Sequence, residues 1–275
     1  MWVHYETILL KKIINIKDIN NIEKNINFDY FRITNLENRL FIKAKHVLFF
    51  PFYISQQDLK NGWYLNKYDL RKHILEIYDK HPNYTFVIEE NMLVDVPDCM
   101  HFIVVDNIML TIDKIFDFML SEFKGKTILV TGSVGKTSTV GMLESVLKAS
   151  NKSVLRIYSK RITPLVLKSY IINFVTPELE YIVMEAEMFY KKHIPYFSKT
   201  MKTYLSIILN VEKEHLGVNG IDTIDDIVEN KVELIRYSKY AIVNGRDERL
   251  SKLKHKSNSI YYKNKKLFDT DLSLL

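Results

Sequence analysis

The segment Thr127-Ile128-Leu129-Val130-Thr131-Gly132-Ser133-Val134-Gly135-Lys136-Thr137-Ser138 decides how this chain is expected to fold. An apolar run enters a turn that contains two glycines, and the residues from Lys136 onward have the pattern of an amphipathic helix. The glycines let backbone N–H groups turn inward, and the helix N-terminus adds partial positive charge. The sequence therefore predicts a binding site for phosphate groups at this junction.

The polar residues of this segment have predicted roles in nucleotide binding. The Lys136 ammonium group would reach the β- and γ-phosphates, and the Thr137 hydroxyl would bind Mg²⁺. The pattern is a shortened P-loop, because Val130 stands where the strict motif has glycine. The alternative is a plain strand–turn–helix junction with an exposed lysine. We interpret the segment as an ATP site, with the cofactor-binding residues Gly132, Ser133, Val134, Gly135, Lys136, Thr137 and Ser138.

The composition is that of an ordinary globular protein with room for two domains. The 275 residues are 47% hydrophobic and 26% charged. The net charge is +6, but the lysines are scattered among acidic residues, so we expect no nucleic-acid partner. The single cysteine excludes a disulfide within the chain. The most apolar run, residues 46–54, is too short to span a membrane, so we expect a cytoplasmic protein without a membrane partner.

The apolar and helical patterns divide the chain into two predicted domains, residues 1–123 and residues 124–275. In the second, strands alternate with helices, which is typical of an α/β fold with a mostly parallel sheet and helices on both faces. The first is predicted to be a smaller α/β domain, with strands at 40–42, 47–50, 85–89 and 102–105 and a helix at 109–123. The second has predicted strands at 127–130, 154–158, 181–185, 204–209 and 240–243, and helices at 136–149, 165–172 and 224–238.

Several polar residues follow the predicted strands of the second domain, where ligands bind in parallel sheets. Glu185 is placed to bind Mg²⁺ beside a nucleotide or to cap the next helix. Asn210 and His215 follow the next strand, and His215 is either a metal ligand or a hydrogen-bonded loop residue. Asn244, in Asn244-Gly245-Arg246-Asp247-Glu248, contacts a base or ribose or forms a polar turn, and the chemistry alone favours the turn.

Lys231 falls on the apolar stripe of the predicted helix 224–238, four residues after Ile227 and four before Ile235. A lysine at such a position either extends its ammonium group to the edge of the helix or is held near neutrality by burial. A neutral amine reacts with carbon dioxide to give a carbamate, which is an anionic metal ligand. Taken alone, the pattern favours extension to the edge.

Together, these motifs resemble the central ATPase domain of the Mur ligase family. The matching segments follow one another in the family's order and at its intervals: Thr131–Ser138, Met184-Glu185, Leu209-Asn210-Val211, Glu214-His215-Leu216 and Asn230-Lys231. The branch that adds the D-alanyl-D-alanine dipeptide to a UDP-N-acetylmuramoyl-tripeptide is the one that the sequence resembles most, also through residues 46–50 and 102–106. The resemblance implies Lys136, His215 and a carbamylated Lys231 as catalytic residues, and Asn210 and Asn244 as further nucleotide contacts.

The resemblance implies an ATP-dependent carboxylate–amine ligase of cell-wall or surface-polymer synthesis. A substrate carboxylate would attack the γ-phosphate, and an amine would displace phosphate from the resulting acyl phosphate. Thr137 and Glu185 would hold one Mg²⁺, while His215 and Lys231 would serve a second metal. The expected substrates are a small-molecule or UDP-sugar/peptide carboxylate and an amino acid or peptide donor.

Two features leave other functions open. Residues 33–39 stand where the family has a short Asp-Ser-Arg signature for its UDP-sugar substrate, and the sequence stops at Leu275 without the family's C-terminal domain. The alternative is therefore a nucleotide-binding half-enzyme or non-catalytic subunit, whose protein partner supplies the amine-binding lid domain. An unrelated P-loop NTPase or kinase is a third hypothesis, which gives Lys231 and His215 no role.

Overall fold

The computed structural model describes residues 5–6, 10, 13–20, 22, 27–33, 44–159, 161–190, 193–213, 216–217, 220–252 and 259–262. The chain forms two compact units. The first contains residues 1–124 and 159–177, and the second contains residues 125–158 and 178–275. The division after residue 123 into a substrate domain and an ATP-binding domain stays a prediction. In the compact units, residues 159–177 group with the N-terminal part.

The second unit is built on a fully parallel sheet with the strand order β13-β12-β11-β8-β10-β9. Its strands are β8 (Lys126–Thr131), β9 (Val154–Ile157), β10 (Tyr181–Glu185), β11 (Leu205–Ile208), β12 (Tyr240–Asn244) and β13 (Ser259–Tyr262). Strand β8 is central, and Ile128, Leu129 and Val130 are all buried because both faces of the sheet are covered there. The predicted P-loop-type α/β fold is confirmed.

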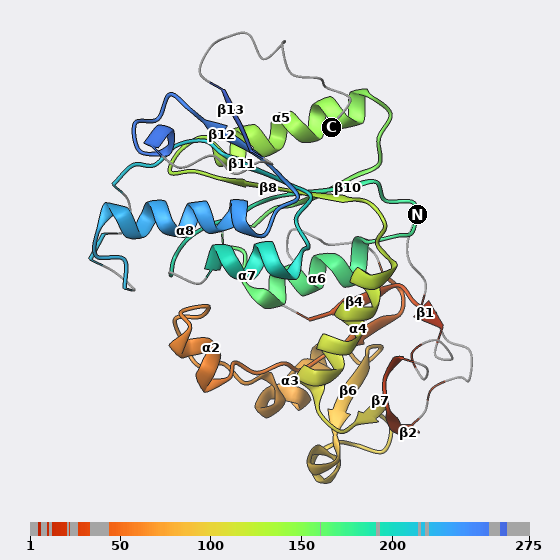
Figure 1. Ribbon diagram of the computed structural model, residues 1–275. Helices are drawn as coiled ribbons and strands as arrows, with labels where there is room; N and C mark the ends of the chain where they lie inside the picture. The colour runs from red at the N-terminus through yellow and green to blue at the C-terminus, as the bar shows by residue number, and fades with distance from the viewer. Residues whose placement is uncertain are drawn as a thin grey trace. The chain divides into compact units, whose positions relative to one another are not determined.

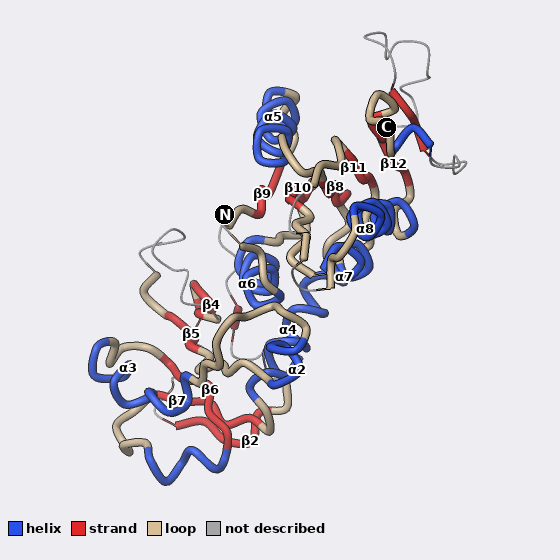
Figure 2. Tube along the Cα trace, turned by 90° about the vertical axis from the view of Figure 1, so that its left-hand side faces the viewer, coloured by secondary structure: helices blue, strands red, loops and turns tan. Residues whose placement is uncertain are grey.

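Helices cover both faces of this sheet (Figure 1). Helix α5 (Lys136–Ala149) packs against β8, β9 and β10, while α8 (Ile224–Arg236) lies on the opposite face against β11 and alongside α7 (His193–Thr200). The turned view shows α5 and α8 on either side of the strands (Figure 2). Under α5, the apolar core joins three strands and the helix through Ile128, Val130, Val140, Val183, Leu205 and Ile207.

Helix α8 has a well-defined start. The Thr223 hydroxyl accepts a hydrogen bond from the Asp226 N–H at 3.1 Å, and the Asp226 carboxylate accepts one from the Thr223 N–H at 2.9 Å. This reciprocal cap satisfies two backbone donors that the helix itself leaves without partners. It fixes Ile224 as the first helical residue, and thereby the rotation of the apolar stripe that carries Lys231.

The first unit contains a mixed sheet with the strand order β2-β7-β6-β5-β4. Strand β2 (Ile16–Asn20) runs antiparallel to β7 (His101–Val105), while β6 (Thr85–Glu89), β5 (Val47–Phe49) and β4 (Tyr30–Arg32) run parallel to β7. A separate antiparallel pair joins β1 (Tyr5–Glu6) and β3 (Asn27–Phe28). The other elements are α2 (Gln56–Lys60), α3 (Ile74–Lys80), α4 (Ile108–Glu122), α6 (Pro164–Phe174) and the short 3₁₀ helices η2 (Leu70–His73) and η3 (Glu90–Asp95).

Helix α6 belongs to the first unit because it packs against α4 and β4. The side chain of Asn173 fastens it to the sheet: Oδ1 accepts from the Phe31 N–H at 2.8 Å, and Nδ2 donates to the Phe31 carbonyl at 3.0 Å. The predicted strand at 40–42 lies outside the described residues. Among the helices in the described part of the chain, none is long and apolar enough to cross a membrane.

Candidate functional site

The turn between β8 and α5 requires glycine at two positions. Gly135 precedes the first residue of α5 with φ of 87°, a left-handed conformation that side chains other than glycine rarely adopt. A Cβ atom on Gly132 would lie only 2.9 Å from Cβ of Leu209. The loop of residues 132–135, called here the glycine loop, therefore lies directly against the end of β11.

Asn210 holds the glycine loop in shape from the neighbouring strand. Its Oδ1 accepts from the Val134 N–H and its Nδ2 donates to the Val134 carbonyl, both at 3.0 Å. Its backbone carbonyl accepts from the Ser133 N–H at 3.3 Å. A second bridge forms where the Ser133 hydroxyl accepts from the Glu212 N–H at 2.8 Å. Asn210 thus supports the loop, and its contact with a cofactor stays a prediction.

Helix α5 begins without a side-chain cap. In contrast, α4, α6 and α8 each begin with a side-chain oxygen that accepts from the first turn, supplied by Asn107, Thr163 and Thr223. The first N–H groups of a helix have no partner within the helix, and they carry partial positive charge. Thr137 and Ser138 are exposed in this first turn. An uncapped start after a glycine loop favours the binding of an anion such as phosphate.

Lys136 adds a full positive charge beside these amides. Its ammonium group donates to the carbonyl of Gly132 at 2.7 Å and to the carbonyl of Ser133 at 3.3 Å. The side chain therefore folds back over the glycine loop, and the charge stays at the helix N-terminus. The predicted placement of Lys136 at the loop agrees with this geometry, while its phosphate contact stays a prediction.

Lys231 reaches the same loop from helix α8. The residue is only 1% exposed, and its Nζ donates to the Ser133 hydroxyl at 2.8 Å. The hypothesis that it extends to the edge of the helix is therefore wrong. The apolar stripe of α8, with Ile227 and Leu234 buried, carries Lys231 inward along with it. Burying an ammonium group is costly unless it is hydrogen-bonded or paired, so the buried position makes Lys231 a candidate functional residue.

Lys136 and Lys231 both line a small cavity of about 40 Å³ next to the glycine loop. The segment that follows β10 supplies the other wall, including Glu187. This segment is held over the loop because the Ala186 N–H donates to the Val130 carbonyl at 2.8 Å. The sequence pattern gives no indication of Glu187, since a carboxylate in an irregular segment has no periodic signal.

Glu185 ends β10 beside Val130 of β8 and is 6% exposed. Its carboxylate therefore belongs to the carboxyl end of the sheet, the edge where the glycine loop begins. In the described part of the chain, no three or more His, Cys, Asp or Glu side chains form a group that could hold a metal ion. A metal at this edge would thus need further oxygen ligands, such as the Thr137 hydroxyl, phosphate oxygens or a carbamate on Lys231. His215, the other predicted metal ligand, lies outside the described residues.

Asn244 and Asp247 form a polar turn after β12. Asn244 Nδ2 donates to the Leu209 carbonyl at 2.8 Å, and its Oδ1 accepts from the Arg246 N–H at 3.0 Å. The Asp247 carboxylate accepts from the Val211 N–H at 2.9 Å and caps the short 3₁₀ helix η4 (Leu250–Lys252). Both side chains therefore brace the end of β11, and contact of Asn244 with a base or ribose stays a prediction.

The fold and the site together define the class of protein: an α/β chain with a parallel P-loop-type sheet and a glycine loop at its carboxyl edge. Residues 130–271, which are 142 of the 275 residues, match the family model described as Mur ligase middle domain. The chain therefore belongs to the Mur ligase family, through this middle domain. A comparison with curated protein sequences finds no match.

Solved structures of Mur ligases share the fold. A crystal structure of MurF from Acinetobacter baumannii superposes with a TM-score of 0.64 at 20% identity, over 91% of this chain and 51% of that one. The MurF ligase of Thermotoga maritima, solved with ADP, gives 0.56 at 22% identity, over 81% and 47%. A pseudomurein peptide ligase type C from Methanothermus fervidus gives 0.50 at 20%, over 85% and 42%. The chain thus spans about half the length of these structures.

Proposed function

We propose that this chain is an ATP-dependent ligase that forms an amide between a carboxylate substrate and an amino acid or peptide, in cell-wall or surface-polymer synthesis. The observation that carries the proposal is the buried Lys231, hydrogen-bonded to Ser133 of a glycine loop that precedes an uncapped helix. Membership of the Mur ligase family supports it. The MurF ligase of Thermotoga maritima, which shares the fold, was solved with ADP.

The residues present fit a nucleotide with Mg²⁺. The N–H groups of the first turn of α5 and the Lys136 ammonium group would hold the phosphates. The Thr137 hydroxyl and the Glu185 carboxylate would bind Mg²⁺, because both are oxygen ligands of the kind that this metal prefers. Bound ATP would supply its γ-phosphoryl group to the substrate carboxylate and leave as ADP, and the amine would then displace phosphate from the acyl phosphate.

Lys231 would act after conversion to a carbamate. Burial favours the neutral amine, and the neutral form is the one that reacts with carbon dioxide. The neutral amine would add to carbon dioxide and release a proton, and the resulting carbamate would be an anionic oxygen ligand beside the glycine loop, with its charge offset by the metal that it binds. Together with His215, this carbamate would serve a second metal, separate from the Mg²⁺ at Thr137 and Glu185, as the family resemblance implies.

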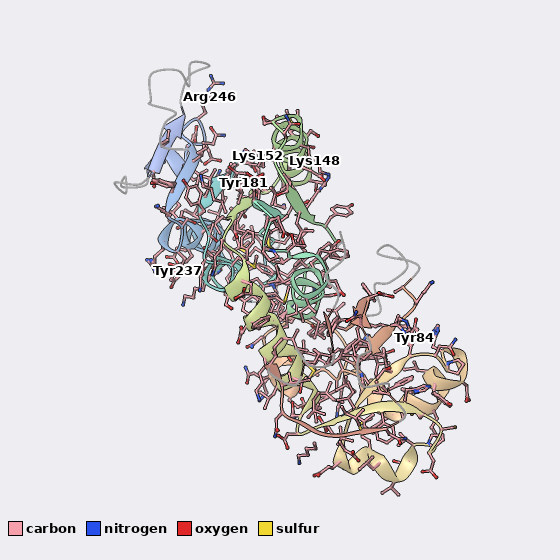
Figure 3. The ribbon with its side chains drawn as sticks, turned by 90° about the vertical axis from the view of Figure 1, so that its right-hand side faces the viewer. Tyr84, Lys148, Lys152, Tyr181, Tyr237 and Arg246 are labelled. Atoms are coloured by element: carbon pink, nitrogen blue, oxygen red, sulfur yellow. The ribbon has the colours of Figure 1, made fainter. Side chains whose placement is uncertain are left out.

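The first experiment measures binding of Mg·ATP by titration calorimetry to the unchanged chain, to Lys136→Ala and to Lys148→Ala. Lys148, which is labelled in Figure 3, is the matched control: it lies in the last turn of α5, away from the loop, and it pairs with Glu144 at 2.7 Å. We expect Lys136→Ala to weaken binding by about 100-fold and Lys148→Ala to leave it unchanged. Equal binding by both variants would contradict the site. Binding without ADP release when carboxylates and amines are supplied would favour the half-enzyme alternative.

A further inference from the structure

The first unit contains a cavity that the proposed nucleotide site does not use. Its volume is about 380 Å³, which lies within the range of small-molecule sites. One wall comes from the segment that follows β5, and the other comes from the start of α6; both belong to the first unit. The cavity is therefore formed within one compact unit.

The wall of this cavity is largely apolar and aromatic. Phe52, Trp63 and Tyr68 line one side, and the Phe52 and Tyr68 rings are tilted to each other with centroids 6.0 Å apart. Leu165 lines the other side. Leu65, which also lines the cavity, is 84% exposed. Aromatic walls with a large exposed apolar side chain are suited to an apolar ring or aliphatic chain.

The polar groups of the cavity gather where α6 begins. The Tyr64 hydroxyl donates to the Thr163 hydroxyl at 3.3 Å and accepts from the Leu165 N–H at 3.4 Å, while the Thr163 hydroxyl accepts from the Val166 N–H at 3.4 Å. The first turn of α6 therefore has its amides satisfied within the protein. A phosphate group would find none of the donors there that α5 offers.

Arg161 is the only charged side chain among the described residues that line the cavity. Its guanidinium group donates to the Gly62 carbonyl. Burial raises the pKa of Tyr64 to about 12, so this hydroxyl remains neutral around pH 7 although Arg161 acts in the opposite direction. The polar end of the cavity thus combines one positive charge with neutral hydroxyls, which matches a single carboxylate rather than a group of several negative charges.

We propose that this cavity binds an amphiphilic carboxylate, with its apolar ring or chain between the aromatic walls and its anionic group toward Arg161. That this ligand is the acceptor substrate of the ligase rests on the proposed function; the binding itself does not. A UDP-linked peptide carries a diphosphate and several carboxylates, and one guanidinium group would leave most of these charges unpaired in an apolar cavity. The sequence agrees with this distinction, because residues 33–39 lack the Asp-Ser-Arg signature for a UDP-sugar.

The experiment uses the fluorescence of Trp63 in the cavity wall. The chain has two tryptophans, so all variants are made in a Trp2→Phe background, which leaves Trp63 as the reporter. The probes are decanoate, decanol and uridine diphosphate. We expect a saturable change with decanoate, binding about fivefold weaker with decanol, and no saturable change with uridine diphosphate. No saturable change with decanoate, or tighter binding of uridine diphosphate, would overturn the proposal.

Two pairs of variants locate the binding. Leu65→Asp places a charge where the ligand chain would lie, and Val94→Asp is the control in the same unit, because Val94 is 91% exposed and does not line the cavity. We expect Leu65→Asp to weaken decanoate binding about tenfold and Val94→Asp to leave it unchanged. Arg161→Gln should abolish the preference for decanoate over decanol, and Arg161→Lys should keep it. Equal affinities across these variants would overturn the proposal.

The readouts separate this inference from the proposed function. Mg·ATP binding to Leu65→Asp is expected to remain normal, and decanoate binding to Lys136→Ala is expected to remain normal. Absence of decanoate binding to the unchanged chain, with intact, Lys136-dependent ATP binding, would refute the cavity proposal alone. Intact decanoate binding without ATP binding would refute the nucleotide site alone.

Discussion

Helices α5 and α6 begin in opposite ways, although each begins beside a cavity. Gly135 precedes α5 and offers no side-chain oxygen to its first turn. Thr163 caps α6, Pro164 follows as its first residue, and Tyr64 accepts from the next N–H group. The start of α5 is therefore left with donors for a ligand, and the start of α6 is closed by the protein itself. Because α5 lacks a cap, its first amides are the ones that could bind an anion.

Substitution in the glycine loop before α5 is expected to have the largest effect on ligand binding. Gly132→Ala places Cβ 2.9 Å from Cβ of Leu209 at a left-handed φ of 157°, so the loop or β11 must move. We expect Mg·ATP binding to fall by about 100-fold or more in titration calorimetry. Gly141→Ala, within α5, is the control, since its Cβ would meet only the flexible end of Arg156 at 3.4 Å. Normal ATP binding by Gly132→Ala would show that the loop shape does not matter.

Substitution of Lys231 tests whether this buried side chain stabilises the fold or takes part in the reaction. Lys231→Met keeps an unbranched side chain of similar volume, one atom shorter, and removes the ammonium group that donates to Ser133. A buried ammonium group carries a desolvation cost that Met does not, and the Ser133 hydroxyl keeps its bond from the Glu212 N–H, so we expect little change in the melting temperature. ATP-dependent product formation should fall by about 1,000-fold if Lys231 carries the carbamate. Unchanged turnover would remove Lys231 from the mechanism, and a large fall in melting temperature would make its role structural.

Local pattern predicted the second unit well because its elements are long and periodic. Helix α5 and strand β10 have the predicted bounds, and α8 starts at the predicted Ile224. Helix α7 (His193–Thr200) was not predicted, because it has only eight residues and contains Pro195 near its start. The grouping of residues 159–177 with the first unit also has no local signal. It depends on contacts such as Asn173 with Phe31, which are 142 positions apart.

The sequence predicted the site residues that belong to a motif. It did not predict the side chains whose orientation depends on tertiary packing. The glycine loop and Lys136 follow from the motif. The apolar stripe on α8 left two orientations open for Lys231, extension to the edge of the helix or burial. Only the packing of α8 on β11 decides for burial. Glu187 and Asp247 lie in irregular segments, so their contacts with the cavity and with Val211 depend on the tertiary fold alone.

Tyr64, whose hydroxyl accepts from the first turn of α6, makes the free energy of unfolding depend on pH. Burial raises its pKa from 10.0 to about 12 in the folded chain. Below pH 10 the residue is neutral in both states and adds no slope. Between pH 10 and about 12 the unfolded chain loses the proton first, so the free energy of unfolding falls with rising pH, by up to about 1.4 kcal/mol per pH unit. Denaturant unfolding at about pH 9, 10 and 11 should show this slope in the unchanged chain and a smaller one in Tyr64→Phe. Equal slopes would mean that the hydroxyl titrates normally.

The smallest expected effect tests the comparison most directly, because the variant removes the side-chain cap of α6 and leaves this helix uncapped, as α5 is. Thr163→Ala takes away the hydroxyl that accepts from the Val166 N–H, and we expect it to lower the free energy of unfolding by about 1 kcal/mol. Thr223→Ala removes the equivalent cap of α8 and should cost a similar amount. Thr163→Ala is expected to leave Mg·ATP affinity unchanged, since an N-terminus opened in α6 lacks the glycine loop and the lysine that accompany α5. If Thr163→Ala acquired inorganic phosphate binding in calorimetry, the missing cap alone would be enough to make an anion site, and the loop and Lys136 would matter less than we argue.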